Sequence, residues 1–206
     1  MSTGSLITKK IFVMAFVLAA ISVGTKAQVQ ISVGPGAGFN FAFHSFDDSN
    51  ESVNHFGPLV TSQVDMQFSR SLGLLLWVDF LSNMSAKDSE EGLDGKFKIN
   101  YLSISPTLKY CLPGSPLYVY AGPGIGFKTK GKLILSYEGV SMETDIPDTK
   151  VRIDARFGIG YDFFLMNKLT LSPFIGFNMG FTEVYTDSDW KINTLQAGIV
   201  LRYNVF

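Results

Sequence analysis

Hydrophobic and polar residues alternate along most of the chain after residue 28. In the segment 151–165, Val151 and every second residue after it are hydrophobic, whereas the residues between them are Arg, Asp or Gly until Phe164 breaks the pattern. A period of two residues is typical of a β-strand with two unlike faces. The same alternation predicts eight strands, at residues 29–43, 57–69, 71–82, 98–110, 116–128, 150–165, 168–182 and 191–206.

The segment 122–126, Gly-Pro-Gly-Ile-Gly, resembles a phosphate-binding loop but lies inside one of these alternating segments. A phosphate loop needs a helix directly after the glycines, because the N–H groups at the helix N-terminus bind the anion. After Phe127, the residues 128–132, Lys-Thr-Lys-Gly-Lys, are polar, punctuated by glycine and strand-like. The glycines are therefore predicted to lie on a strand face, and no nucleotide or other cofactor is expected.

The predicted connections between strands alternate in length. Short connections are expected at residue 70, at 111–115 and near residue 167, and long polar ones at 44–56, 83–97, 129–149 and 183–190. Outer-membrane barrels have short turns at one rim and long loops at the other. The sequence therefore predicts an all-β fold, an eight-stranded antiparallel up-and-down transmembrane β-barrel.

The composition of the two strand faces indicates which one lines the interior. The apolar faces of eight strands are too extensive to pack inside an eight-stranded barrel, so we expect them to face lipid. The opposite faces combine small residues with charges of both signs, which can pair in a narrow lumen. The predicted lumen charge network consists of Asp65, Asp79, Lys109, Arg152, Asp154, Arg156, Asp162 and Arg202.

The N-terminal segment has the features of a secretory signal peptide. Two lysines precede the apolar run 11–24, and the small residue Ala27 fits a cleavage site. We expect a cleaved signal peptide at 1–27 and one outer-membrane β-barrel domain at 28–206. Cleavage removes three lysines and changes the formal net charge from −1 to −4, which gives no electrostatic reason to expect nucleic acid as a partner.

Neither a catalytic nor a metal site is expected. The connection 44–56 holds His44, His55 and three acidic residues, but without the tight ligand spacing of a metal site, so a solvated loop is predicted. Cys111 is the only cysteine, so an internal disulfide is excluded. The carboxylates of the lumen faces lie near arginines, which favours ion pairs over proton transfer. We therefore expect that the protein is not an enzyme.

Several stretches carry a resemblance that spans the whole mature chain. The leader KKIFVMAFVLAAISVGTKAQ, the segments VGPGAGFNFAF, PLYVYAGPGIGF and FGIGYDFF, and the C-terminal Phe206 resemble the outer-membrane protein β-barrel domain family of Bacteroidetes-type bacteria, sometimes called PorT-like. The resemblance implies a Gram-negative cell outer membrane, contact with outer-membrane lipid, and insertion by the outer-membrane assembly machinery. That machinery reads the last strand and its terminal aromatic, so Tyr203 and Phe206 are the expected assembly signal, although they lie three residues apart rather than on one face.

Several functions are compatible with such a barrel. The favoured hypothesis is a structural or binding protein with a charged, largely plugged lumen and long surface loops, whose surface or secretion partner is unknown. The alternatives are a narrow pore or hydrophobic-ligand conduit, an accessory factor in protein secretion, and a soluble exported lipid-binding barrel with its apolar face inside. In the conduit hypothesis, the pocket is lined by Trp77, Tyr118, Tyr120 and Phe174.

Overall fold

The computed structural model describes residues 29–46, 49–90, 93–137, 140–145, 151–183 and 191–205. These residues form β1 (Gln30–Phe46), β2 (Ser49–Gln67), β3 (Leu72–Asn83), β4 (Ala86–Glu90), β5 (Leu93–Cys111), β6 (Leu117–Tyr137), β7 (Val140–Asp145), β8 (Arg152–Tyr161), β9 (Phe163–Met166), β10 (Leu169–Gly180) and β11 (Lys191–Asn204). In these ranges, no helix has the length and apolar character needed to cross a membrane.

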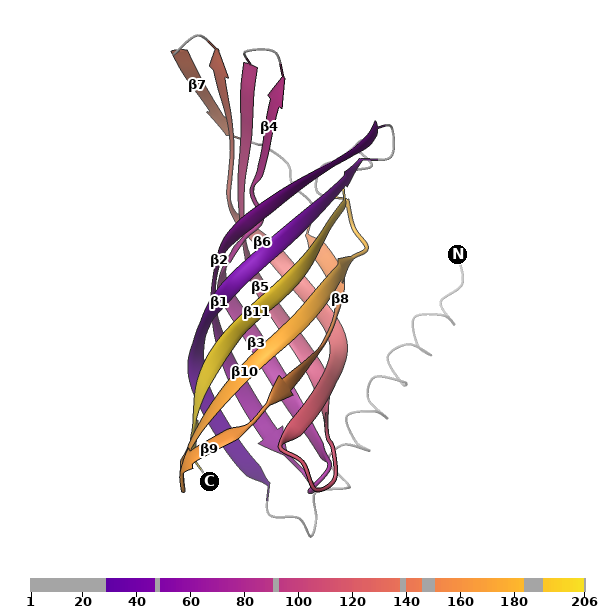
Figure 1. Cartoon of the computed structure of the whole chain (residues 1–206), viewed down its shortest axis with the longest axis vertical. Coiled ribbons are helices and arrows are strands. Elements are labelled where there is room, and N and C mark those ends of the chain that lie inside the picture. The colour runs from indigo at the N-terminus through magenta and orange to yellow at the C-terminus, as the bar shows by residue number, and fades with distance from the viewer. Residues whose placement is uncertain are drawn as a thin grey trace, which may run out of the picture.

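Eight of these strands close into a barrel. Each of β1, β2, β3, β5, β6, β8, β10 and β11 pairs antiparallel with the next in this order, and the pairing of β1 with β11 closes the ring (Figure 1). Every backbone donor and acceptor in such a ring finds a neighbouring strand, and no edge is left in the wall. The predicted eight-stranded antiparallel barrel is confirmed.

The polar strand faces point into this barrel and the apolar faces point out. On β8, the side chains of Arg152, Asp154 and Arg156 are buried, whereas those of Ile153 and Phe157 are exposed on the outer wall. The same alternation follows β3, β10 and β11. A soluble barrel would bury its apolar face, so this arrangement suits a wall surrounded by lipid.

Three of the predicted long loops are wrong, because the strands continue through them. The segment 44–56 belongs mostly to β1 and β2, 83–97 contains β4 and the start of β5, and 129–149 contains the end of β6 and β7. The strands β4, β5, β6 and β7 pair in that order and form a four-stranded sheet that projects beyond the barrel rim (Figure 1). Just above the rim, lysines such as Lys98, Lys130 and Lys132 replace the apolar outer face, and this stretch looks like a loop in the sequence.

The predicted strand 150–165 is interrupted once. β8 ends at Tyr161 and β9 begins at Phe163, while the N–H of Asp162 bonds to the carbonyl of Pro116 at 3.0 Å. This irregularity keeps the Asp162 side chain inside the barrel and turns Phe163 and Phe164 outward together. It explains why Phe164 breaks the alternation in the sequence.

The two ends of the barrel differ. The short turns at 68–71, 112–116 and 167–168 lie at the same end as the start of β1 and the end of β11, opposite the β4–β7 extension (Figure 1). Outer-membrane barrels place short turns on the periplasmic side. The extension therefore lies on the extracellular side.

Candidate functional site

The lumen is the candidate site, because it gathers all eight charged residues that the strand faces predicted. Each of the eight is buried, and they comprise four acids and four bases. Residues far apart in sequence meet here because the closed ring brings their strands face to face across the interior. They form three separate groups at successive levels of the barrel.

The lower group, nearest the short turns, is a network of two acids and two bases. Lys109 Nζ donates to Asp65 at 2.7 Å and to Asp162 at 3.0 Å. Arg202 donates to the same two carboxylates and, at 2.7 Å, to the Ser172 hydroxyl. The Ser172 hydroxyl in turn donates to Asp162 at 2.7 Å. Each base thus contacts both acids, and the network links β2, β5, β10 and β11 across the lumen.

The middle group is built on one ion pair and one ring. Arg156 Nη1 donates to Asp79 Oδ2 at 2.9 Å, and the Thr61 hydroxyl donates to Asp79 Oδ1 at 2.7 Å. The Arg156 guanidinium lies 4.0 Å from the centroid of the Trp77 ring. A guanidinium can stack on an aromatic face while its N–H groups remain available for a carboxylate.

The upper group surrounds Arg152 near the extracellular rim. Arg152 Nε lies 3.3 Å from Asp154 Oδ2, and its other nitrogens contact Met84 Sδ at 2.8 Å and the Ile192 carbonyl at 3.4 Å. The guanidinium also lies 6.0 Å from the centroid of the Tyr101 ring. This group combines one ion pair with contacts to a sulfur, a carbonyl and an aromatic ring, whereas the lower network consists of four charged side chains and a hydroxyl.

Four aromatic side chains connect the lower and middle groups. The Trp77 ring lies 4.8 Å from Phe174 and 5.3 Å from Tyr120, and Tyr120 lies 6.2 Å from Tyr118, all between centroids. Lys109 Nζ sits 4.3 Å from the Tyr118 centroid. The four rings that the conduit hypothesis assigns to a pocket pack against one another as an apolar cluster.

Glycines on the wall make room for the two tyrosines. A Cβ atom at Gly160 would overlap the Tyr118 ring, and one at Gly158 or Gly176 would overlap the Tyr120 hydroxyl. This close approach gives the alternating glycines of the sequence a packing role. The glycines of the segment 122–126 lie inside β6, which confirms that they belong to a strand and not to a phosphate loop.

A cavity of about 820 Å³ opens at the short-turn end, and the lower network forms its inner part. The turn 112–116, Arg70 and Lys168 line its mouth, and Cys111 lines its side. In the described part of the chain, no group of three metal-ligating side chains is present. The charged side chains that line the inner part of the cavity form ion pairs with one another.

Some predicted residues lie elsewhere. Tyr203 is on the outer wall of β11 with Lys168 Nζ 5.9 Å from its ring centroid, whereas Phe206 falls outside the described residues. The signal segment 1–27, like residues 47–48, also falls outside them. The prediction of a solvated loop is wrong for His44, because β1 continues and carries this side chain into the upper lumen, where Nε2 lies 3.1 Å from the Ser85 carbonyl.

Sequence reasoning missed the neutral partners of the charges. Thr61 and Ser172 were visible as polar residues on inward faces, but nothing in their spacing showed which carboxylate each would contact. Met84 was hidden in a predicted loop. These contacts depend on how side chains meet inside the closed ring, so strand periodicity alone does not reveal them.

Comparisons with known proteins agree with this architecture. The family described as outer membrane protein β-barrel domain matches residues 15–203. OprG of Pseudomonas aeruginosa has 11% identity, covers 86% of this chain and 96% of its own, and superposes with a TM-score of 0.54. A major outer membrane protein of Thermus thermophilus has 12% identity, with 86% and 99% covered and a TM-score of 0.54.

The solved structures share the fold at low identity, and no curated protein matches the chain significantly. The Bacteroidetes, PorT-like part of the resemblance stays a prediction. The family match covers nearly all of the barrel described above. The chain therefore belongs to the outer membrane protein β-barrel domain family, and it is a small β-barrel protein of the cell outer membrane.

Proposed function

We propose that this protein is a structural or binding element of the outer membrane, with a plugged lumen that holds the wall rigid and a β-sheet extension presented outside the cell. The observation that carries the proposal is the filled lumen, with two charge groups joined by the aromatic cluster around Trp77 and Phe174. A closed eight-stranded barrel leaves an interior just wide enough for side chains. A rigid plugged barrel is a suitable anchor for a projecting surface element.

A pore or hydrophobic-ligand conduit is the second candidate. The side chains that fill the lumen argue against an open path through it. The lower network crosses the lumen from Lys109 on β5 to Arg202 on β11, and the aromatic cluster packs directly above it. A soluble lipid-binding barrel would need its apolar face inside, which is the reverse of the observed burial. An accessory role in secretion rests on the PorT-like resemblance alone.

The proposal also holds that the protein is not an enzyme. The buried carboxylates of Asp65, Asp79 and Asp162 each contact a lysine or an arginine. We infer that these carboxylates serve to pair the buried bases and not to transfer protons. Partners that follow from the proposed role are outer-membrane lipid around the wall and the outer-membrane assembly machinery during insertion.

Single-channel recording tests whether the lumen is plugged. We expect the purified folded protein to produce no stepwise conductance in a planar bilayer. The Trp77→Ala/Phe174→Ala variant, checked for folding by its heat-shifted band on an SDS gel, should pass more current because the cluster above the lower network is removed. Regular conductance steps from the unaltered protein would contradict the plugged lumen and favour the pore.

A further inference from the structure

The outer wall changes from apolar to polar at one level of β5 and β6. On β5, Leu102 and Ile104 face outward among the lipid-facing side chains, and the next outward positions are Asn100 and Lys98. On β6, Phe127 is the last exposed apolar residue before Lys130. The backbone pairings Leu102 with Phe127 and Asn100 with Lys130 place the change at the same height on both strands.

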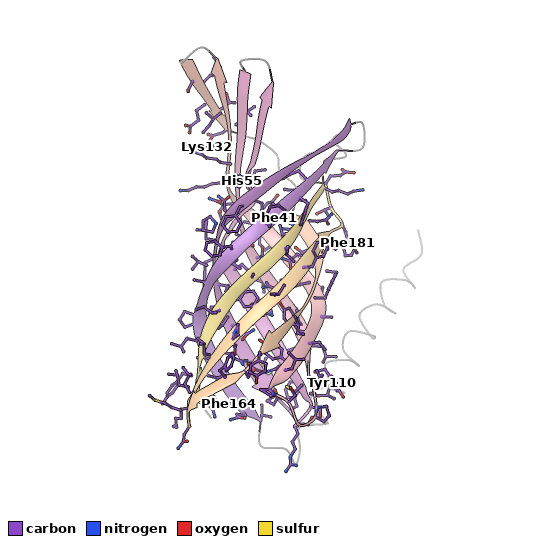
Figure 2. The ribbon with its side chains drawn as sticks, viewed as in Figure 1. Phe41, His55, Tyr110, Lys132, Phe164 and Phe181 are labelled. Atoms are coloured by element: carbon purple, nitrogen blue, oxygen red, sulfur yellow. The ribbon has the colours of Figure 1, made fainter. Side chains whose placement is uncertain are left out.

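Lysines collect directly above this boundary on one face. Lys98 pairs in register with Lys132, and Lys130 pairs with Asn100 one step closer to the barrel. Figure 2 shows Lys132 at the foot of the extension, above the outward-facing side chains of the barrel wall. Like charges directly opposite each other on neighbouring strands destabilise a sheet. An anion bound between them would remove this cost.

The acids of β7 satisfy only part of this charge. Lys132 donates to Glu143, and this contact raises the pKa of Lys132 and lowers the pKa of Glu143. Lys98 contributes a weaker attraction to the same carboxylate. Asp145 lies opposite Lys132 in register. Among the residues that the structure describes, Lys130 forms no ion pair, so Lys98 and Lys130 retain most of the uncompensated charge.

We propose that Lys98 and Lys130, with Lys132 beside them, bind the phosphate-bearing headgroup of a lipid in the outer leaflet. At about 3.3 Å per residue, Lys98 lies on the order of 13 Å along the strand from Leu102, and a lysine stem can bend back toward the interface. This is headgroup height for a lipid whose chains contact Ile104 and Phe127. Phosphate groups at a membrane surface attract each nearby lysine by about 1 kcal/mol.

The site is outside the barrel and is independent of whether the lumen conducts. It gives a phosphate-binding role to one face of the extension, where the lysines look scattered in the sequence. A lipid fits this site because it carries a phosphate at headgroup height and acyl chains that contact the apolar wall below. A soluble phosphate lacks the chains that would contact the wall below.

Binding of a fluorescent bisphosphorylated lipid A to the folded protein in maltoside micelles tests the proposal. The dephosphorylated lipid with the same acyl chains is the matched ligand. We expect the unaltered protein to prefer the phosphorylated lipid, and Lys98→Gln/Lys130→Gln to weaken its binding about thirtyfold with no change for the dephosphorylated lipid. Arg70→Gln/Lys168→Gln removes the same charge at the opposite rim and should change binding less than about twofold.

Each other outcome would overturn the assignment. Equal affinity of the unaltered protein for the two lipids would show that the phosphates are not recognised. Unchanged binding by Lys98→Gln/Lys130→Gln would place the site elsewhere, and an equal loss with Arg70→Gln/Lys168→Gln would reduce it to net charge. Displacement of the lipid by millimolar inorganic phosphate would indicate a site for free phosphate. A heat-shift gel on each variant shows that the compared proteins are folded.

Discussion

At the scale of single residues, Arg202 joins three polar partners of the lower network. It contacts Asp65, Asp162 and Ser172 from β11, and it is almost fully buried. We expect Arg202→Ala to lower the free energy of unfolding by about 3–5 kcal/mol, because two carboxylates would share one remaining base in a low-dielectric interior. Urea unfolding of the barrel in lipid vesicles, followed by the heat-shifted gel band, measures this change.

Arg70 provides the matched comparison for Arg202. It lies on a short turn at the mouth of the same cavity, but it is exposed. Arg70→Ala should leave the unfolding midpoint unchanged, since a charge in contact with water contributes little to stability. An equal shift for the two variants would mean that net charge, and not the buried network, stabilises the barrel.

The sequence predicts the location of these charges better than their partners. Period-two alternation puts Lys109 and Asp162 on inward faces, and both are found there. Their contact joins β5 to the break between β8 and β9, and that break follows from a bond of Asp162 N–H to the turn at Pro116. Phe164 marks an interruption of the alternation, but nothing in the sequence shows the bond to Pro116 or the contact of Asp162 with Lys109, so the pairing needed the three-dimensional structure.

At the scale of strands, β6 and β8 fit together through glycines. The Tyr118 ring covers Gly160, its partner on the adjacent strand, so closely that a methyl group would overlap it. We expect Gly160→Ala to cost about 1–3 kcal/mol of unfolding free energy, the usual effect of overpacking a filled interior. The same urea titration measures it.

Ala197 on β11 serves as the control for this packing. It faces outward, so Ala197→Val adds two methyl groups on the lipid side of the wall. We expect no measurable destabilisation there, because lipid chains adapt to the added volume. If both variants cost the same, the tyrosine–glycine contact would not be a specific feature of the interior.

The extension shows where strand prediction from polarity fails. Within the barrel, outward residues of β5 such as Ile104 are apolar, whereas near the extracellular rim Lys98 faces outward and its neighbour Ile99 is buried in the upper lumen. The period of two continues, but the outward face now meets water instead of lipid. A search for an apolar outer face therefore ends the strand too early, at the level where the membrane ends.

At the scale of the whole molecule, exposed hydrophobic residues belong to two environments. Ile175, in the middle of β10, is 54% exposed on the barrel wall, and Met142, on β7 of the extension, is 68% exposed. Exposure alone gives no reason to expect different responses to a charge. Their positions relative to the membrane do give such a reason, because Ile175 lies near the middle of the hydrocarbon and Met142 lies beyond the extracellular rim. We expect Ile175→Lys to lower the unfolding free energy in lipid vesicles by about 2–4 kcal/mol and Met142→Lys to leave it nearly unchanged. A similar response of the two variants would contradict the position of the membrane around the barrel wall.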